Sequence, residues 1–179
     1  QALQLPVRAG MIAGDGLLQV SDGTISAEVI YEVVELPLGA PLVINEIDYD
    51  QPGEDNGEFI ELYNASGAAL SLEGLRLELI NGSNREVYQT YQLSGAGAEL
   101  PAGAFLLIAP PAILGMAPGA LGLPLMGSIQ NGGPDALRIV DGAGATIDAL
   151  SYEGSVMGAV EGDGLPDEQS DRGDGSIGR

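Results

Sequence analysis

The feature that most constrains this chain is its succession of short apolar runs, each broken by a turn. The 179 residues include 28 glycines and 11 prolines, which interrupt the chain at short intervals. In residues 75–80, apolar residues alternate with Arg76 and Glu78, which is the period of a half-buried strand. The sequence has no amphipathic helix of useful length. Short strands separated by polar turns predict an all-β, antiparallel β-sandwich.

The expected strands of this sandwich follow from the same patterns. They cover residues 42–47, 58–63, 75–80, 87–93, 104–109, 125–130, 136–140 and 146–152. We expect residues 110–124, which are rich in proline and glycine, to form a long surface loop. The same breaks argue against a membrane-spanning helix in the uncharged stretch 100–134.

An N-terminal arm is expected ahead of the sandwich. Two apolar runs flank Asp22-Gly23, a dipeptide that favours a tight hairpin turn because glycine tolerates positive φ. We therefore expect residues 1–37 to form a β-hairpin arm or the remnant of an upstream Ig-like domain. Residues 41–179 are expected to form the sandwich, with 161–175 as an acidic, glycine-rich loop or tail.

The composition removes most catalytic mechanisms. The chain has no His and no Cys, and all six basic residues are Arg. Imidazole acid–base chemistry, thiol nucleophiles and lysine Schiff bases are therefore excluded, as are ordinary zinc, haem and iron–sulfur sites. Carboxylate chemistry remains, either as an acid–base pair or as hard oxygen ligands for Ca²⁺. The net charge of −20 argues against direct nucleic-acid binding and favours cationic partners.

The loop between the first two expected strands of the sandwich is the candidate metal site. Six oxygen-bearing side chains fall within a short span there, namely Asp48, Asp50, Glu54, Asp55, Asn56 and Glu58. Ca²⁺ takes six to eight oxygen ligands in flexible geometry, so this loop predicts a Ca²⁺ site. The spacing is not that of an EF-hand, because Pro52 and Phe59 stand at ligand positions of that motif. The alternative interpretation is a solvated acidic loop.

Two further sets of acidic residues suggest less. The cluster near the C-terminus, which we interpret as an acidic tail, contains Glu161, Asp163, Asp167, Glu168, Asp171 and Asp174. Glu58 and Glu61 lie three apart on one expected strand, so they point to opposite faces. Two carboxylates on opposite faces cannot flank one glycosidic bond, so a glycosidase pair is not expected.

Several other motifs in the sequence each have a functional and a simpler interpretation. The tripeptides Asn64-Ala65-Ser66 and Asn81-Gly82-Ser83 are glycosylation sequons at turns that we expect to be accessible. Arg172-Gly173-Asp174 spells a cell-adhesion tripeptide, which chance explains in a tail rich in Gly and Asp. The apolar residues of the expected surface loop either form a partner-binding patch or fold over the end of the sandwich. They are Ile113, Leu114, Met116, Leu121, Leu123, Leu125 and Met126.

Five blocks of the sequence resemble the bacterial lamin tail domain. In the family's order they are LVINEI from residue 42 with EFIELYN from 58, LSLEGL from 70, LPAGAFLLI from 100, SIQNGGPDALRI from 128 and IDALSY from 147. The resemblance implies an immunoglobulin-like β-sandwich. The last residues, SIGR from 176, resemble a block after which the family continues into a closing strand that we expect this chain to lack. The segment around Asp22-Gly23 resembles the final hairpin of a bacterial Ig-like or cadherin-like repeat.

The resemblance implies a non-enzymatic structural or interaction module of a secreted or cell-surface bacterial protein. Gln1 in place of Met fits a signal peptide already removed, so we expect an extracellular location. A sandwich that lacks one strand exposes an unpaired edge, to which residues 25–36 of a neighbouring copy could add. Repeated head to tail, that contact gives a fibre. The expected partners are thus other copies or cell-surface proteins. The alternative is an accessory domain, for targeting or substrate binding, of a larger secreted hydrolase such as a nuclease or phosphatase.

Overall fold

The computed structural model describes residues 14–21, 26–33, 40–51, 56–160, 164 and 176–178. The chain divides into two compact units, Gln1–Glu35 and Leu36–Arg179. Regular structure is almost entirely β, as predicted. The helical turns among the described residues are α1 (Pro111–Leu114) and the 3₁₀ turn η1 (Leu93–Gly95).

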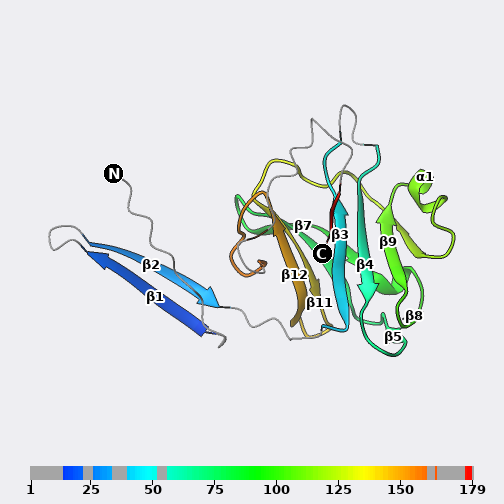
Figure 1. The fold of residues 1–179 in the computed structure, drawn as a ribbon, viewed down its shortest axis with the longest axis horizontal. Coiled ribbons are helices and arrows are strands. Elements are labelled where there is room, and N and C mark those ends of the chain that lie inside the picture. Colours follow the sequence, from blue (N-terminus) through cyan, green and yellow to red (C-terminus); the bar gives the residue numbers. More distant parts are fainter. Residues whose placement is uncertain are drawn as a thin grey trace. The chain divides into compact units, whose positions relative to one another are not determined.

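The first unit contains a two-stranded antiparallel hairpin (Figure 1). Strand β1 (Gly14–Ser21) pairs with β2 (Ser26–Val33) in continuous register, from Gly14 opposite Val33 to Ser21 opposite Ser26. A hairpin therefore forms where Asp22-Gly23 predicts one, although the turn residues themselves lie outside the described residues.

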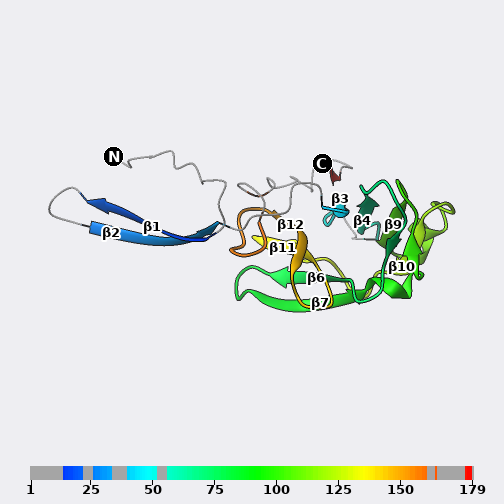
Figure 2. The same ribbon diagram turned by 90° about the horizontal axis from the view of Figure 1, so that it is seen from below.

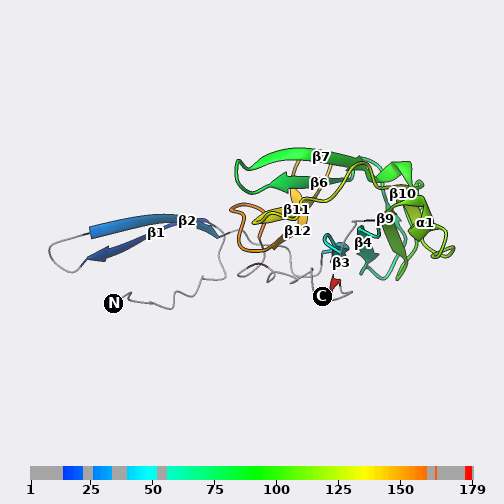
Figure 3. The same ribbon diagram turned by 90° about the horizontal axis from the view of Figure 1, so that it is seen from above.

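The second unit is a β-sandwich whose two sheets lie one above the other (Figure 2, Figure 3). One sheet has the strand order β10 (Leu121–Pro124), β9 (Phe105–Ala109), β4 (Phe59–Asn64), β3 (Leu42–Asp48) and β13 (Ile177–Gly178). The other has the order β12 (Thr146–Tyr152), β11 (Asp135–Val140), β6 (Arg76–Asn81) and β7 (Glu86–Gln92). A small pair joins β5 (Leu70–Ser71) to β8 (Glu99–Leu100). The neighbours pair antiparallel, except that β10 runs parallel to β9.

Side chains that alternate along the strands fill the space between the sheets. In β4, Ile60 and Leu62 are fully buried while the residues between them are only partly covered. In β6, Leu77 and Leu79 point inward, and Arg76 and Glu78 point outward. Burying each such side chain contributes about 1.5–3 kcal/mol, so the period-2 pattern of the sequence translates directly into the core.

A buried carboxylate joins the two sheets along one side of the sandwich. Strand β3 bulges between Ile44 and Glu46. The Oδ2 atom of Asp148, on β12, accepts a hydrogen bond of 2.7 Å from the Ile44 N–H. Beyond the bulge, β13 pairs with Ile47 and Glu46 of β3. The SIGR block from residue 176 therefore supplies β13, and part of the β3 edge is occupied.

The structure corrects two expectations. Residues 110–124 are not all loop, because they contain α1 and end in the edge strand β10. No strand forms over residues 125–130. After Leu125, whose N–H donates to the Ala109 carbonyl, side chains from the core rather than a neighbouring strand bind the backbone of this segment.

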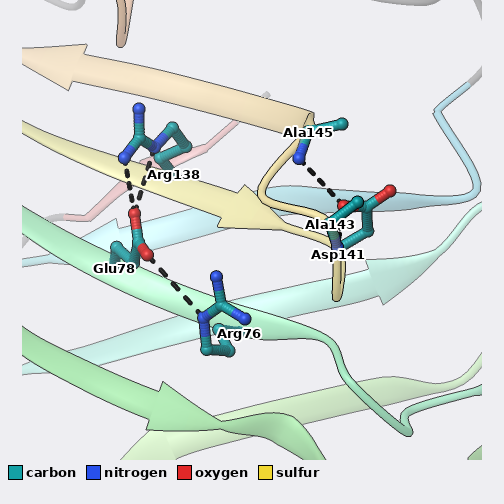
Figure 4. A network of polar contacts seen from close by, with 6 residues as sticks. All are labelled: Arg76, Glu78, Arg138, Asp141, Ala143 and Ala145. Atoms are coloured by element: carbon teal, nitrogen blue, oxygen red, sulfur yellow. Dashed lines mark hydrogen bonds and ion pairs between the residues drawn. The ribbon is translucent and has the colours of Figure 1, made fainter.

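The outer face of the four-stranded sheet carries an ion-pair network (Figure 4). The Glu78 carboxylate lies between Arg138 on β11, at 2.6 Å, and Arg76 on its own strand, at 3.8 Å. At the far end of β11, the Asp141 Oδ1 atom accepts hydrogen bonds from two backbone N–H groups of the following turn. These partly exposed contacts fix the outer face of the sheet and the β11–β12 turn.

Candidate functional site

The loops of one end of the sandwich meet around Tyr152, the last residue of β12. The Tyr49 ring, in the loop after β3, lies 4.4 Å from the Tyr152 ring between centroids. The Tyr152 hydroxyl donates a 2.8 Å hydrogen bond to the Gln130 carbonyl. Asn81 at the end of β6 pairs with Asp135 at the start of β11. Tyr49, residues 125–135 and the β6–β7 turn therefore share one end of the domain.

Four of the six predicted Ca²⁺ ligands fall within the described residues. Asp48 accepts a hydrogen bond of 2.6 Å from the Gln51 side chain, whose own Oε1 accepts from the Gly57 N–H at 2.7 Å. Gln51 thus fastens the two described flanks of the loop. In the described residues no three acidic side chains are grouped to hold a metal ion. Glu54 and Asp55 lie outside them, so the Ca²⁺ site, which also includes Asp50 and Asn56, stays a prediction.

Glu58, the last of those six residues, has an inward role. Its side chain is only 2% exposed, and its Oε2 accepts a 3.2 Å hydrogen bond from the Ile129 N–H. Glu61 lies on the other face of the strand, where it accepts a hydrogen bond from the Asn45 amide. The two glutamates therefore point apart, as the spacing predicts.

Tyrosine hydroxyls bind the rest of residues 126–130. The Met126 N–H donates to the Tyr91 hydroxyl at 3.0 Å, and the Gln130 N–H donates to the Tyr88 hydroxyl at 3.1 Å. Together with Glu58 and Tyr152, these side chains satisfy backbone groups that a strand would pair with a neighbour. The sequence predicts a strand over residues 125–130 because the segment is apolar at its start. In the structure, side chains rather than a neighbouring strand bind its backbone.

The protonation of these tyrosines matches their roles. Burial raises the pKa of Tyr88 to about 12, and the hydrogen bond from Gln130 offsets part of that rise. Burial also raises the pKa of Tyr152, with the negative charge of Asp135 adding to the effect. Burial raises the pKa of Tyr91, with a further contribution from Glu58. The hydroxyls therefore stay protonated through the physiological range, and Tyr152 remains a donor to Gln130.

A polar pocket of about 280 Å³ opens beside residues 126–130. Its lining combines one carboxylate, three amides and one hydroxyl with two residues that offer mainly backbone or apolar surface. The lining residues are Asn81, Ser128, Ile129, Gln130, Asn131, Gly132 and Asp135. Asp135 is 3% exposed, and its Oδ1 accepts a 3.0 Å hydrogen bond from the Gly82 N–H.

Close backbone packing fixes the walls of the pocket. A Cβ on Gly82 would lie 1.9 Å from the Pro134 carbonyl oxygen, and one on Gly133 would lie 2.2 Å from the Glu153 Cβ. The Gly133 N–H also donates to Glu153. A side chain at position 82 would push the β6–β7 turn away from Pro134, and one at position 133 would push that residue away from Glu153, so glycine is required at both positions. A pocket with walls this constrained is largely preformed.

None of the sites predicted from the sequence includes this pocket, although the sequence contains a signal for it. Asp135 is in phase with Leu137 and Ile139, which point into the core. An acidic residue at an inward position of a strand is rare unless it is paired or functional. The residues that complete the pocket lie far apart in the chain, so their proximity depends on the sheet topology.

The two predicted sequons differ in accessibility. Asn64 is fully buried. Its Nδ2 atom, the atom a glycan would modify, donates to the carbonyls of Ala68, Leu100 and Pro101. The turn that follows is accessible, as expected, because Ala65, Gly67 and Ala68 are exposed. The Asn64 side chain is not, since it fastens the β4 turn to the β8–β9 turn. Asn81 is half-buried, and its Oδ1 accepts from Ser83.

The apolar residues of 113–126 divide between the two interpretations. Leu121, Leu123 and Leu125 pack against the core, so this part folds over the sandwich end. Met116 and Met126 are 72% and 53% exposed. The acidic cluster from Glu161 to Asp174 and the Arg172-Gly173-Asp174 tripeptide lie outside the described residues.

A family match accounts for this architecture. Residues 37–154 match the family model of the Lamin Tail Domain. The chain belongs to the lamin tail domain family, as the five blocks of sequence indicate. Domains of this family are Ig-like modules, which fits a non-enzymatic structural or interaction role. No curated protein matches the chain. The described helices include none that is long and apolar enough to cross a membrane.

Proposed function

We propose that this chain is a secreted or cell-surface interaction module that assembles with further copies of itself by strand addition. The observation that carries the proposal is the β1–β2 hairpin. Its strands pair with each other along eight residues, and among the described strands neither has a second neighbour. A two-stranded hairpin on its own is only marginally stable in water, so addition to another sheet would stabilise it.

The receiving edge that we favour is β7. In the described part of the chain, β7 pairs on one side only, with β6. Its seven residues are close in length to the eight of β2, and Val87 near its start is 43% exposed. The edge strand β10 is a poorer acceptor, because it is four residues long and ends in Pro124.

Strand addition of this kind joins two different surfaces. The hairpin of one copy would meet the sandwich of the next, so each copy would use both surfaces. Such a heterologous contact repeats without closing and would build a fibre. The β3 edge is a poorer acceptor than β7, because β13 and Asp148 occupy part of it.

Size-exclusion chromatography with light scattering tests the proposal. We expect residues 1–179 to form species whose mass grows with concentration, and residues 38–179 to stay monomeric. Val87→Asp should also stay monomeric, because a charge on an edge strand hinders the addition of another strand. Met116→Asp is the matched control, since Met116 is exposed and lies outside β7, and it should assemble as the unchanged chain does. A monomeric full-length chain at all concentrations would contradict the proposal.

A further inference from the structure

The pocket beside residues 128–132 contains a buried carboxylate to which no cation of the described residues is paired. Asp135 is 97% covered, and the Gly82 N–H that donates to it carries no charge. Within the described residues the ion pairs are those of Glu78 with Arg76 and Arg138, so none reaches Asp135. Buried charges in proteins are ordinarily paired or bound to a cation, and a cationic ligand would offset this cost.

The size of the pocket selects among cations. At about 280 Å³ the pocket is several times the volume of a water molecule, so it accommodates a polyatomic group. A bare metal ion would also need several charged or carbonyl oxygens close together, and Asp135 is the one carboxylate in the lining.

The hydrogen-bonding groups of the lining select further. The side chains of Ser128, Gln130 and Asn131 have no hydrogen-bond partners among the described residues and line the pocket with Asp135. Each offers an oxygen acceptor. A guanidinium group carries five N–H donors in a planar fork and no acceptor, and it is more weakly hydrated than an ammonium group. Several acceptors around one carboxylate therefore match guanidinium better than ammonium.

We propose that this pocket binds an arginine side chain presented by a partner protein, with its guanidinium on Asp135. The close packing at Gly82 and Gly133 keeps the backbone around Asp135 in place before binding, which lowers the entropy cost. The chain's charge of −20 would also steer a basic partner toward the site. This inference does not depend on assembly through the hairpin, because every residue of the pocket belongs to the sandwich.

Nuclear magnetic resonance with small probes tests the site in the full chain. The probe is N-acetyl-arginine methylamide, and the readout is the shift of the Gly82 and Gly132 amide signals during titration. We expect saturable shifts with this probe and weaker binding of N-acetyl-lysine methylamide. N-acetyl-citrulline methylamide, which has nearly the same shape without the charge, should cause no saturable shift. Asp135→Asn should weaken binding of the arginine probe by about tenfold or more, because it removes the charge and keeps an acceptor for Gly82.

A matched variant and two ligand arms make the outcome decisive. Asp141→Asn changes a carboxylate at the other end of β11, where it binds only its own turn, and should leave the titration unchanged. Equal binding of the citrulline probe would overturn the proposal in favour of a neutral ligand. Equivalent, competing shifts with CaCl₂ would overturn it in favour of a metal site. The absence of any saturable shift in the folded wild-type chain would overturn it outright, even if Asp135→Asn fails to fold.

Discussion

The hydroxyl of Tyr152 offers the sharpest test of how residues 125–130 are held. The change Tyr152→Phe removes one oxygen atom and keeps the ring against Tyr49. The lost bond to the Gln130 carbonyl is 2.8 Å long, and Tyr152 is fully buried. A typical hydrogen bond contributes about 1 kcal/mol, and a buried acceptor left without a donor costs about 1–3 kcal/mol. Gln130 is only half-buried, so water can reach its carbonyl, and we expect a loss of about 1–2 kcal/mol.

The assay is thermal unfolding followed by circular dichroism. In a domain of this size, each kcal/mol lowers Tm by about 2–4 °C or slightly more, so Tyr152→Phe should lower Tm by about 3–8 °C. The control is Tyr63→Phe. Tyr63 packs on Phe105, and its hydroxyl has no hydrogen-bond partner in the described part of the chain, so that change should stay within about 0.5 kcal/mol. Equal Tm values for the two variants would refute the view that side chains substitute for a strand here.

Three further predictions concern the same end of the sandwich. Gly82→Ala should destabilise the domain by about 3 kcal/mol or more, because its Cβ would lie 1.9 Å from a backbone oxygen. Chemical denaturation measures this loss. The control Gly67→Ala should have almost no effect, because its Cβ meets nothing within 4 Å. The raised pKa of Tyr88, about 12 against an ordinary 10.0, predicts stability that is fully present below pH 10 and declines as pH rises toward 12; urea midpoints across that interval should fall for the unchanged chain and fall less for Tyr88→Phe. The predicted acidic-loop site should bind Ca²⁺ at micromolar to millimolar concentration; calorimetry that finds no heat, together with an unchanged Tm at millimolar Ca²⁺, would reject it.

Local pattern carried most of the fold prediction. The alternation in β6, with Leu77 and Leu79 inward, is confirmed because each side chain's face depends only on its neighbours in sequence. The strand β10 was missed because it is held by parallel pairing with β9, which no local period encodes. The strand expected at 125–130 was wrong for a related reason, since Glu58 and the tyrosines that bind it come from three other strands or their ends.

The candidate sites show the same division. Acidic residues that are neighbours in sequence drew attention to the loop after β3, whereas the pocket needs Asn81 and Asp135 to meet across β6 and β11. The sequence alone shows whether an acidic residue of a strand lies on the same face as the apolar core residues. Asp135 is in step with Leu137, and Asp148 is in step with Leu150, and both carboxylates are buried. Acidic residues at inward positions therefore mark the pocket at Asp135 and the contact between the sheets at Asp148, which composition alone does not reveal.

The hydrogen bond from the Ile44 N–H to Asp148 also affects how the chain folds during synthesis. Its two residues are 104 positions apart in the chain. At about 5–20 residues per second, synthesis would deliver Asp148 roughly 5–20 s after Ile44. During that interval the bulged strand β3 has its hydrogen-bonding edge uncovered, and uncovered edges recruit other strands. The nascent chain therefore depends on slow, long-range closure of this edge. A variant without Asp148 should aggregate more than the unchanged chain does during expression.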